Sequence, residues 1–401
     1  LHPMAEEGKE ASGSMGDDTP VAVLSSHFRP IAHYFRQNFS QVTNPPIDSL
    51  RENKVMSLKT RFGNLGNILD FDNLTEENIY VLDSPILTNS QFKKFKNIFS
   101  KKIKIIDCTF EINSPLKSRI ESIKTESEIA VREGSSTLIL SDKNISKFKA
   151  SIPTILAVGA VHSHLVKLGL RGYCSINVES SDALDTHSFA VLIGVGATTI
   201  NPYLAIDSIY QRFEKKLFGD SDFESCVLKF KKSIDAGLLK IMSKMGISVI
   251  SSYRGGCNFE AVGLSRAIVA DYFPGMVSRI SGIGILGIEK KIKALHAKFS
   301  EKNVIVLPIG GLYKYRKTGE DHQYQGSLIH LLQHAVGTGS YEHYKKYSKG
   351  IQGLPPINLR DLLQFNKKKK SIDINEVESV EEILKRFGSG SMSHGALSKE
   401  A

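Results

Sequence analysis

The sequence predicts an α/β fold in which parallel βα units form a rudimentary or partial TIM-barrel-like domain. From about residue 78, short β-branched runs alternate with segments whose apolar residues recur at steps of three and four. Five or six such units follow one another, which favours parallel strands joined by right-handed crossovers. Polar residues follow the predicted strands, as they do at one rim of a barrel: Asp107, Asp142, Glu179, Asn201 and Ser252.

Each expected strand is a short apolar run between turn residues. In chain order these strands span 79–82, 103–107, 137–140, 173–178, 198–201, 247–252 and, with a glycine turn, 304–311. Each expected helix carries an apolar stripe, and the segments are 116–134, 153–169, 182–193, 203–218, 227–246, 286–299, 325–335 and 377–387. The first 44 residues are expected to form loop and short helix, and 42–48 a rigid extended segment because Pro45 and Pro46 exclude a helix.

The stretch 242–284 joins an amphipathic helix to a strand, a glycine turn and a further helix. Gly246 ends the first helix, and the strand at 247–252 would deliver Arg254 into a loop of the kind that carries function in α/β proteins. Arg254 suits an anion contact and an interdomain salt bridge equally well. Cys257 has the setting of an activated thiolate beside this arginine, but no histidine partner is identifiable, so a small semi-buried cysteine is favoured.

The composition excludes several classes of protein. With 401 residues, 41% of them hydrophobic, the chain can build two or three domains, or one large α/β unit with an appendage. We expect a soluble protein, because no run approaches the roughly 18 apolar residues of a membrane span, and the start at Leu1 suggests a fragment. The four cysteines form no CxxC pair, which argues against a zinc site or a disulfide framework and fits a reducing compartment.

The net charge of +10 invites a nucleic-acid-binding interpretation. The excess consists of scattered lysines and a run at 367–370, without the interleaved arginine and aromatic residues that stacking and phosphate contacts favour. We therefore predict no nucleic-acid partner. A basic α/β module that binds nucleic acid or an acidic partner is the alternative to the enzyme interpretation given below.

Three short motifs have a chemical interpretation. His162 and His164 are two apart, so on a helix they point in different directions and cannot share one ion. His330 and His334 are four apart, which does allow ligation, but no third ligand is evident and an ordinary helix face is favoured. The turn at 194–196 lacks the third glycine and the later acidic residue of a dinucleotide-binding motif. We therefore predict no metal site.

Several long segments resemble the large chain of the glutamate synthase family. They lie at 2–10, 13–20, 38–48, 139–142, 155–158, 201–205 and across almost all of 242–284, so the resemblance covers essentially the whole chain. In that family a glutaminase domain precedes a central domain, an FMN-binding βα-barrel with a [3Fe-4S] cluster and a C-terminal β-helix. The resemblance implies a central domain at 1–365, a linker and helix at 366–388, and the truncated start of the FMN-binding βα-barrel at 389–401.

The resemblance also implies a cofactor site at the C-terminal edge. Met392, Ser393 and Gly395 fall where the family's barrel begins, and small residues there permit close approach of the backbone to the flavin. The iron–sulfur cluster and most or all of the FMN contacts are expected outside this segment. His394 departs from the aromatic residue that is common in the family.

The reaction implied by the resemblance uses two sites. Glutamine is hydrolysed, ammonia passes through an internal tunnel, and it adds to 2-oxoglutarate beside reduced FMN, so that two glutamates form. Our hypothesis is that Thr19, Thr43 and Asn44 belong to the rigid wall of that tunnel, and that Arg254 lies at a tunnel or domain interface. The segment itself is expected to be inactive alone.

The implied partners are the glutaminase and FMN domains of the same chain. The electron donor stays open between an NAD(P)H-oxidising subunit or region and ferredoxin, and the implied location is cytoplasmic, or plastid if ferredoxin is the donor. Cys257, Asn258 and Ser188 depart from the residues common in the family, so no role is carried over to them.

Overall fold

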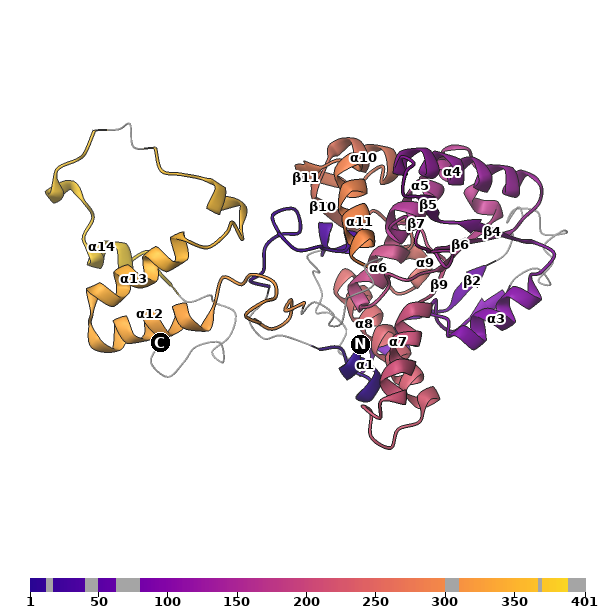
Figure 1. Cartoon of the computed structure of the whole chain (residues 1–401), viewed down its shortest axis with the longest axis horizontal. Coiled ribbons are helices and arrows are strands. Elements are labelled where there is room, and N and C mark those ends of the chain that lie inside the picture. Colours follow the sequence, from indigo (N-terminus) through magenta and orange to yellow (C-terminus); the bar gives the residue numbers. More distant parts are fainter. Residues whose placement is uncertain (12–16, 40–49, 63–79, 300–309, 367–369, 389–401) are drawn as a thin grey trace. The chain divides into compact units, whose positions relative to one another are not determined.

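The computed structural model describes residues 1–11, 17–39, 50–62, 80–299, 310–366 and 370–388 (Figure 1). The chain divides into two units, Leu1–Ile357 and Asn358–Ala401. The described part of the second unit holds three short helical segments: η4 (Leu359–Leu362), η5 (Ile374–Glu376) and α14 (Val380–Leu384). The helix predicted at 377–387 is therefore present but shorter. All other elements described below belong to the first unit.

The largest sheet of the first unit is parallel and has the strand order β4-β6-β8-β9. These strands are β4 (Ile103–Asp107), β6 (Thr137–Ser141), β8 (Ser175–Glu179) and β9 (Thr199–Asn201), each within a residue or two of its predicted position. The helices between them are α4 (Leu116–Arg132), α5 (Thr154–Lys167) and α6 (Thr186–Gly194). Every strand thus lies beside its predecessor in the chain, which confirms an α/β fold with parallel βα units.

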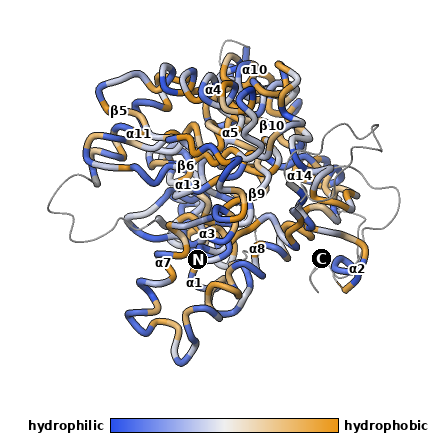
Figure 2. Tube along the Cα trace, turned by 90° about the vertical axis from the view of Figure 1, so that its right-hand side faces the viewer, coloured by the Kyte–Doolittle hydropathy of each residue, from blue (hydrophilic) through white to orange (hydrophobic). Residues whose placement is uncertain are grey.

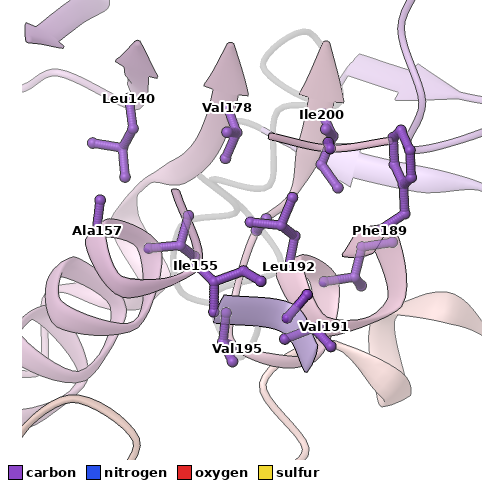
Figure 3. Close-up of a cluster of buried hydrophobic side chains, with 14 of the residues drawn as sticks. Leu140, Ile155, Ala157, Val178, Phe189, Val191, Leu192, Val195 and Ile200 are labelled. Carbon is purple, nitrogen blue, oxygen red and sulfur yellow. The ribbon is translucent and has the colours of Figure 1, made fainter. Parts of the chain in front are cut away.

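Both faces of this sheet are covered by packed side chains. Successive side chains of β6 point to opposite faces, so neighbouring residues of this strand belong to different clusters. Leu138 and Leu140 belong to the main hydrophobic core, whereas Ile139 packs with phenylalanines of α3 (Asn89–Ile98) in a second cluster. Figure 3 shows Leu140, Val178 and the adjoining strands facing the apolar side chains of α5 and α6. In Figure 2 hydrophobic stretches gather around β6 and α5; β6 is buried at every position, and α5 is buried from Thr154 to Val161.

The helix predicted before Gly246 is confirmed as α8 (Phe223–Met245). Asp222 caps its first turn by accepting a hydrogen bond from the Ser225 amide at 2.8 Å. The predicted stripe is buried at Val227, Phe230, Ile234 and Leu238, among others. Gly246 ends the helix with a φ of 70°, a left-handed conformation that glycine adopts without a steric penalty.

The strand predicted at 247–252 is wrong. Val249 makes an isolated parallel bridge with Ser57, and the chain then forms the short helix α9 (Ile250–Tyr253). Ile250 and Tyr253 are three residues apart, so one helical turn buries both, and both are almost fully inaccessible to solvent. A short apolar run fits either a strand or a helical turn, and tertiary packing decides here. Ser252 consequently does not end a strand.

The strand predicted at 79–82 exists as β3 (Tyr80–Leu82), but it pairs antiparallel with β2 (Thr60–Phe62) in a separate sheet. The prediction that it opens the parallel sheet is therefore wrong. The chain returns to the parallel sheet a few residues later, where Ile86 makes a parallel bridge with Ile200. The direction of pairing depends on β2, a partner strand of only three residues that the sequence did not predict.

A three-stranded sheet, which the sequence did not predict, has the order β1-β10-β11. Its strands are β1 (Phe35–Gln37), β10 (Phe259–Leu264) and β11 (Val277–Ile283), and α10 (Arg266–Tyr272) connects the last two. β10 pairs antiparallel with β1 and parallel with β11. A Cβ atom at Gly282 would lie 2.2 Å from the carbonyl oxygen of Gly263, so the close approach of β10 and β11 requires glycine there.

The remaining elements of the first unit are mostly helical (Figure 1). They are α1 (His2–Glu6), η1 (Ile31–Tyr34), α2 (Glu52–Val55), β5 (Thr109–Glu111), β7 (Lys149–Ser151), η3 (Arg171–Tyr173), α7 (Tyr203–Glu214), α11 (Ile285–Phe299), α12 (Gly326–Thr338) and α13 (Tyr341–Gln352). Most of the strand predicted at 304–311, and all of the extended segment at 42–48, lie outside the described residues. In the described part of the chain, no helix combines the length and apolarity that crossing a membrane requires.

Candidate functional site

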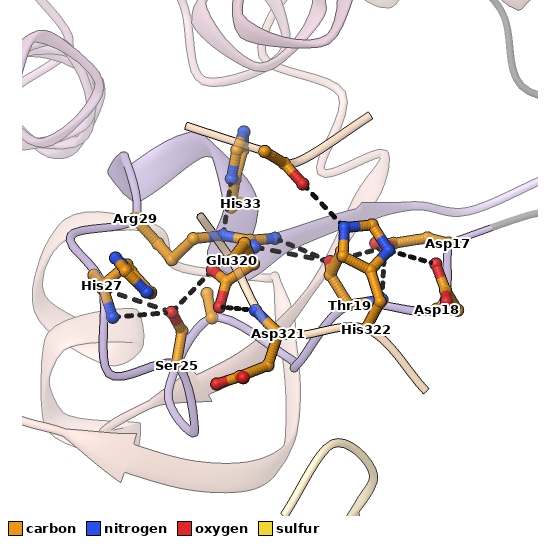
Figure 4. A network of polar contacts seen from close by, with 12 residues as sticks. Asp17, Asp18, Thr19, Ser25, His27, Arg29, His33, Glu320, Asp321 and His322 are labelled. Atoms are coloured by element: carbon orange, nitrogen blue, oxygen red, sulfur yellow. Dashed lines mark hydrogen bonds and ion pairs between the residues drawn. The ribbon is translucent and has the colours of Figure 1, made fainter. Parts of the chain in front are cut away.

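A cavity of about 310 Å³, lined mainly by residues with charged or polar groups, lies between three segments that are far apart in the sequence. The lining residues come from the N-terminal segment, the start of α6 and the loop after residue 310: Asp17, Asp18, Arg29, His33, Arg36, Asp185, His187, Leu312 and Tyr313. Three carboxylates and two guanidinium groups thus face one space. Figure 4 shows the network of polar contacts that holds two of these segments together.

The network is centred on a buried ion pair between Arg29 and Glu320. Arg29 Nη1 lies 2.9 Å from Glu320 Oε2, and the two side chains are only 6% and 3% exposed. Ser25 Oγ donates to the same carboxylate at 2.8 Å, and the Asp321 amide donates to its other oxygen at 3.1 Å. Burial raises the pKa of Glu320, but these hydrogen bonds outweigh it and the net pKa is lowered. Glu320 is therefore a fully engaged carboxylate.

Thr19, a predicted tunnel residue, is buried in the wall behind the cavity and is not among the residues that line it. Its amide and its hydroxyl both donate to Asp17 Oδ1, at 3.0 and 2.6 Å. The hydroxyl oxygen also accepts from Arg29 Nη1 and Nη2, at 3.4 and 3.5 Å. Thr19 thus positions two charged residues that do line the cavity, one of each sign.

His33 faces the cavity as a neutral imidazole. Arg29 Nε donates to His33 Nδ1 at 3.0 Å, so this nitrogen carries no proton. Burial and the charge of Arg29 lower the pKa of His33 from 6.5 to about 4. At neutral pH this side chain therefore has no acidic proton to give to a base in the cavity.

His322, by contrast, carries a proton on both ring nitrogens. Its Nδ1 lies 2.8 Å from Asp18 Oδ1 and its Nε2 lies 2.6 Å from the carbonyl oxygen of Gly311. Both partners can only accept, so both nitrogens must donate and the ring is an imidazolium. Burial lowers the pKa of His322, but the bonds to Gly311 and Asp18 outweigh it and the net pKa is raised from 6.5. The Asp18 carboxylate also accepts from the Tyr324 amide at 3.0 Å, and the pKa of Asp18 is lowered.

We expect the Asp18→Asn substitution to destabilise the protein most in mildly acidic solution. The raised pKa of His322 stabilises the fold below its unfolded value of about 6.5, and this contribution is lost as the pH rises through the folded pKa. The lowered pKa of Asp18 has the opposite pH dependence: its contribution to stability is present above pH 3.8. This contribution is lost only as the pH falls through the folded pKa, which lies below 3.8. The difference in melting temperature between the natural and variant proteins should be larger at about pH 5.5 than at about pH 8.5. A difference that does not change, or that grows with pH, would contradict the ionised pair.

The other predicted site residues are not brought to this cavity by the described structure. Thr43 and Asn44, and the proposed flavin contacts Met392, Ser393 and Gly395, lie outside the described residues. Arg254 follows α9 and lies beside His162 and Arg171, near a different cavity. Of the predicted site residues that the structure describes, Thr19 alone therefore belongs to the site at the N-terminal segment.

The predicted polar rim of the parallel sheet is present at β4, β6, β8 and β9. Ser141 Oγ donates to Glu179 Oε2 at 2.7 Å, and Ser181 Oγ donates to Asp142 Oδ2 at 2.6 Å. Glu179 also pairs with Lys143 at 2.9 Å. Burial raises the pKa of Asp142 to about 6. The rim is therefore a network of hydrogen bonds and ion pairs between neighbouring strand ends.

The cysteines and histidines form no metal centre within the described residues, where no three potential ligands gather around one point. His162 bonds to Arg171 and His164 lies 2.9 Å from Glu128, so the two rings have different partners. Cys257 is exposed, which corrects the expectation of a semi-buried side chain, and the other three cysteines are buried.

Comparison with known proteins decides the family. The family model described as "Glutamate synthase central domain" matches residues 1–265, and the one described as "Conserved region in glutamate synthase" matches residues 322–401. The chain belongs to the glutamate synthase family. The resemblance seen in the sequence is thereby confirmed.

Relatives in this family differ in their electron donor. The glutamate synthase (NADPH) large chain of Azospirillum brasilense is 54% identical over 404 residues, covering 100% of this chain and 27% of that protein. The corresponding large chain of Bacillus subtilis is 41% identical, and the match covers 100% of this chain and 26% of that protein. The ferredoxin-dependent glutamate synthase of Pyropia yezoensis is 39% identical, and the match covers 99% of this chain and 27% of that protein. The chain thus spans about a quarter of the length of these glutamate synthases.

Sequence reasoning missed most of the functional side chains around the cavity. Arg29 and Glu320 are 291 residues apart, and no local pattern predicts their contact. The cluster Gly319-Glu320-Asp321-His322 in a glycine-containing loop was the available signal, because loops with several charged residues often carry function. Nothing in the sequence connected that loop to residues 17–36.

Proposed function

We propose that this chain is the central part of a glutamate synthase, an enzyme that makes two L-glutamate from L-glutamine and 2-oxoglutarate with two electrons delivered through FMN. The observation that carries the proposal is the 54% identity to the Azospirillum brasilense large chain over this entire chain. The segment acts as a scaffold and as part of the ammonia path, and it has no activity alone. Glutaminase and FMN domains of the same polypeptide are its partners.

The proposed domains follow the family order. Residues 1–365 form the central domain, 366–388 a linker and helix, and 389–401 the start of the FMN-binding βα-barrel. The sequential strand order β4-β6-β8-β9 supports a rudimentary or partial TIM-barrel-like arrangement of the central domain. Met392, Ser393 and Gly395 are proposed to approach the flavin, which supplies the hydride for the synthase reaction.

The described residues do not fit an iron–sulfur cluster. Such clusters are held by several cysteine thiolates that meet at one point. Cys108, Cys174 and Cys226 are buried singly and Cys257 is exposed, with no three ligands together in the described part of the chain. The [3Fe-4S] cluster of the family is therefore assigned to residues outside this segment.

The cavity beside Arg29 suits the passage of ammonia. Its lining offers hydrogen-bond acceptors at Asp17, Asp18 and Asp185. The guanidinium groups of Arg29 and Arg36 also line it, and such groups keep their protons. The neutral His33 is not a proton donor to ammonia, which favours the nucleophilic form of the molecule. The Arg29–Glu320 pair fixes the wall from behind. Thr19, Thr43, Asn44 and Arg254 remain our proposed tunnel or interface residues.

The reductant is either NADPH or NADH acting through another subunit or region, or ferredoxin. Relatives of both kinds exist, including a ferredoxin-dependent enzyme of Spinacia oleracea that is named chloroplastic. The proposed location is the cytoplasm, or a plastid for a ferredoxin-dependent form.

The Thr19→Val substitution is expected to uncouple the two half-reactions in the full-length enzyme. Valine keeps the shape of threonine but removes the hydroxyl that holds Asp17 and Arg29 in place, so ammonia escapes to solvent. The ratio of glutamine hydrolysed to 2-oxoglutarate consumed should rise above one, while the rate with excess ammonium is retained. The consumption of glutamine and of 2-oxoglutarate is measured in parallel in the same reaction.

Thr125→Val is the matched control, because Thr125 is exposed on α4 and its hydroxyl donates to the carbonyl oxygen of Glu121 in the same helix. It should leave the ratio at one. If Thr19→Val also leaves the two activities fully coupled, Thr19 does not belong to the ammonia path.

A further inference from the structure

A second cavity, of about 260 Å³, lies at the end of α5 and is lined by His162, Ser163, Gly194, Gly255 and Cys257, among others. It is separate from the cavity beside Arg29 and shares no lining residue with it. Two arginines lie behind this lining and are not part of it: Arg171 bonds to His162, and Arg254 precedes Gly255 in the chain.

Arg171 is a cation whose partners are all uncharged. Its Nε donates to His162 Nδ1 at 3.1 Å, Nη1 donates to the Cys174 carbonyl oxygen at 2.5 Å, and Nη2 donates to the Gly196 carbonyl oxygen at 3.0 Å and to Thr198 Oγ1 at 3.3 Å. None of these acceptors carries a negative charge. The hydrogen-bonding capacity of this guanidinium group is used, but its charge is not compensated.

Arg254 is a second cation beside the first. Its Nε and Nη2 are out of reach of solvent and have no hydrogen-bond partner in the described structure. Burial and the charge of Arg171 lower the pKa of Arg254 to about 10. Neither arginine forms an ion pair with a carboxylate of the described residues. A buried donor without an acceptor, next to a like charge, is unfavourable unless an anion completes the site.

His162 adds a directed N–H donor. Because Nδ1 accepts from Arg171, the proton of the neutral ring is on Nε2, which has no partner among the described residues. The ring is held between two glycines: a Cβ at Gly196 would lie 2.4 Å from it, and a Cβ at Gly255 would lie 3.0 Å from Nε2. Burial and the two arginines lower the pKa of His162 to about 4, so it stays neutral and keeps this orientation.

We propose that this second cavity binds a small free oxyanion, a phosphate or a carboxylate, with His162 as the hydrogen-bond donor in its lining and with Arg171 and Arg254 supplying positive charge from behind that lining. The cluster supplies N–H donors and positive charge with no acceptor of matching charge, which is the composition that oxyanions require. The site is independent of the proposed ammonia path and does not rest on the proposed function.

Cys257 provides a reporter, because it lines the cavity and is the exposed one of the four cysteines. In the full-length protein, the anionic reagent iodoacetate should alkylate Cys257 faster, relative to neutral iodoacetamide, than it does free cysteine, by about tenfold. Inorganic phosphate should abolish this preference, and phosphate should also raise the melting temperature above that in chloride of equal ionic strength. Peptide mass spectrometry identifies the labelled cysteine.

The Arg254→Met variant should lose both the iodoacetate preference and the thermal shift with phosphate, whereas Arg254→Lys should retain part of both. Lys346→Gln, which removes one positive charge from an ion pair on α13, is the control and should behave like the natural protein. The proposal is wrong if Cys257 of the natural protein shows no preference for iodoacetate and phosphate neither slows its alkylation nor raises the melting temperature. In that case the cavity either holds an acidic side chain of the protein or stays empty. Loss of coupling in the Thr19 experiment would have no bearing on this result.

Discussion

Glu320→Ala is expected to lower the free energy of unfolding by about 3–5 kcal/mol, because it leaves the Arg29 guanidinium buried without its counter-ion. Ser25 and the Asp321 amide lose their acceptor at the same time. Urea denaturation of the natural and variant proteins measures the change. Glu320→Gln keeps an acceptor for Ser25 but removes the charge. Its free energy of unfolding should lie between those of the natural protein and of Glu320→Ala.

The double variant Arg29→Met/Glu320→Leu separates charge from packing. It removes both ions and fills a similar volume with apolar atoms, so it should recover most of the stability that Glu320→Ala loses. The surface control is Glu342→Ala on α13, whose partner is Lys346 and whose side chain is 76% exposed; it should change the stability by less than about 1 kcal/mol. Equal effects of Glu320→Ala and Glu342→Ala would show that burial of the Arg29 pair has no energetic consequence.

Phe189→Ala is expected to destabilise the first unit by about 3–5 kcal/mol, through lost burial and the cavity that remains. Phe189 is on α6, is 0% exposed and packs at 6.5 Å, ring to ring, against Phe230 of α8. The substitution therefore loosens α6. The N-cap residue of this helix, Asp185, and His187 in its first turn both line the cavity beside Arg29. The melting temperature of the full-length protein reports the effect.

Phe365→Ala is the matched control for that substitution. Phe365 is 97% exposed, so its removal should change the melting temperature very little. If the two phenylalanine variants melt at the same temperature, the packing of α6 against α8 does not limit stability.

Elements with a strong local pattern were predicted well from the sequence. The stripe from Val227 to Met245 has helical spacing and a glycine at its end, and α8 follows it closely. β6 has a run of three apolar residues between Thr137 and Ser141 and is buried at every position, which fits a strand buried on both faces. In both cases the local preference and the tertiary environment favour the same structure.

The failures occur where tertiary partners decide. The run at 247–252 has β-branched residues, yet burial of Ile250 and Tyr253 on one side produces a helical turn. β1 has only three residues and exists because β10 pairs with it. The cavity beside Arg29 depends on contacts such as Arg29–Glu320, which join distant segments. The chemistry-bearing residues were therefore visible in the sequence, but their grouping was not.

The pairing of β1 with β10 also has a consequence for the order in which the molecule is made. Gln37 bonds to Asn258, 221 positions later in the chain. At about 5–20 residues per second, a ribosome needs roughly 10–45 s to synthesise that partner after Gln37. The parallel sheet can assemble during this interval, since each of its strands docks beside the one made just before. The wall of the cavity that contains Asp17 and Arg29 is completed only when Glu320 has been synthesised, so the site is among the last parts of the first unit to become fixed.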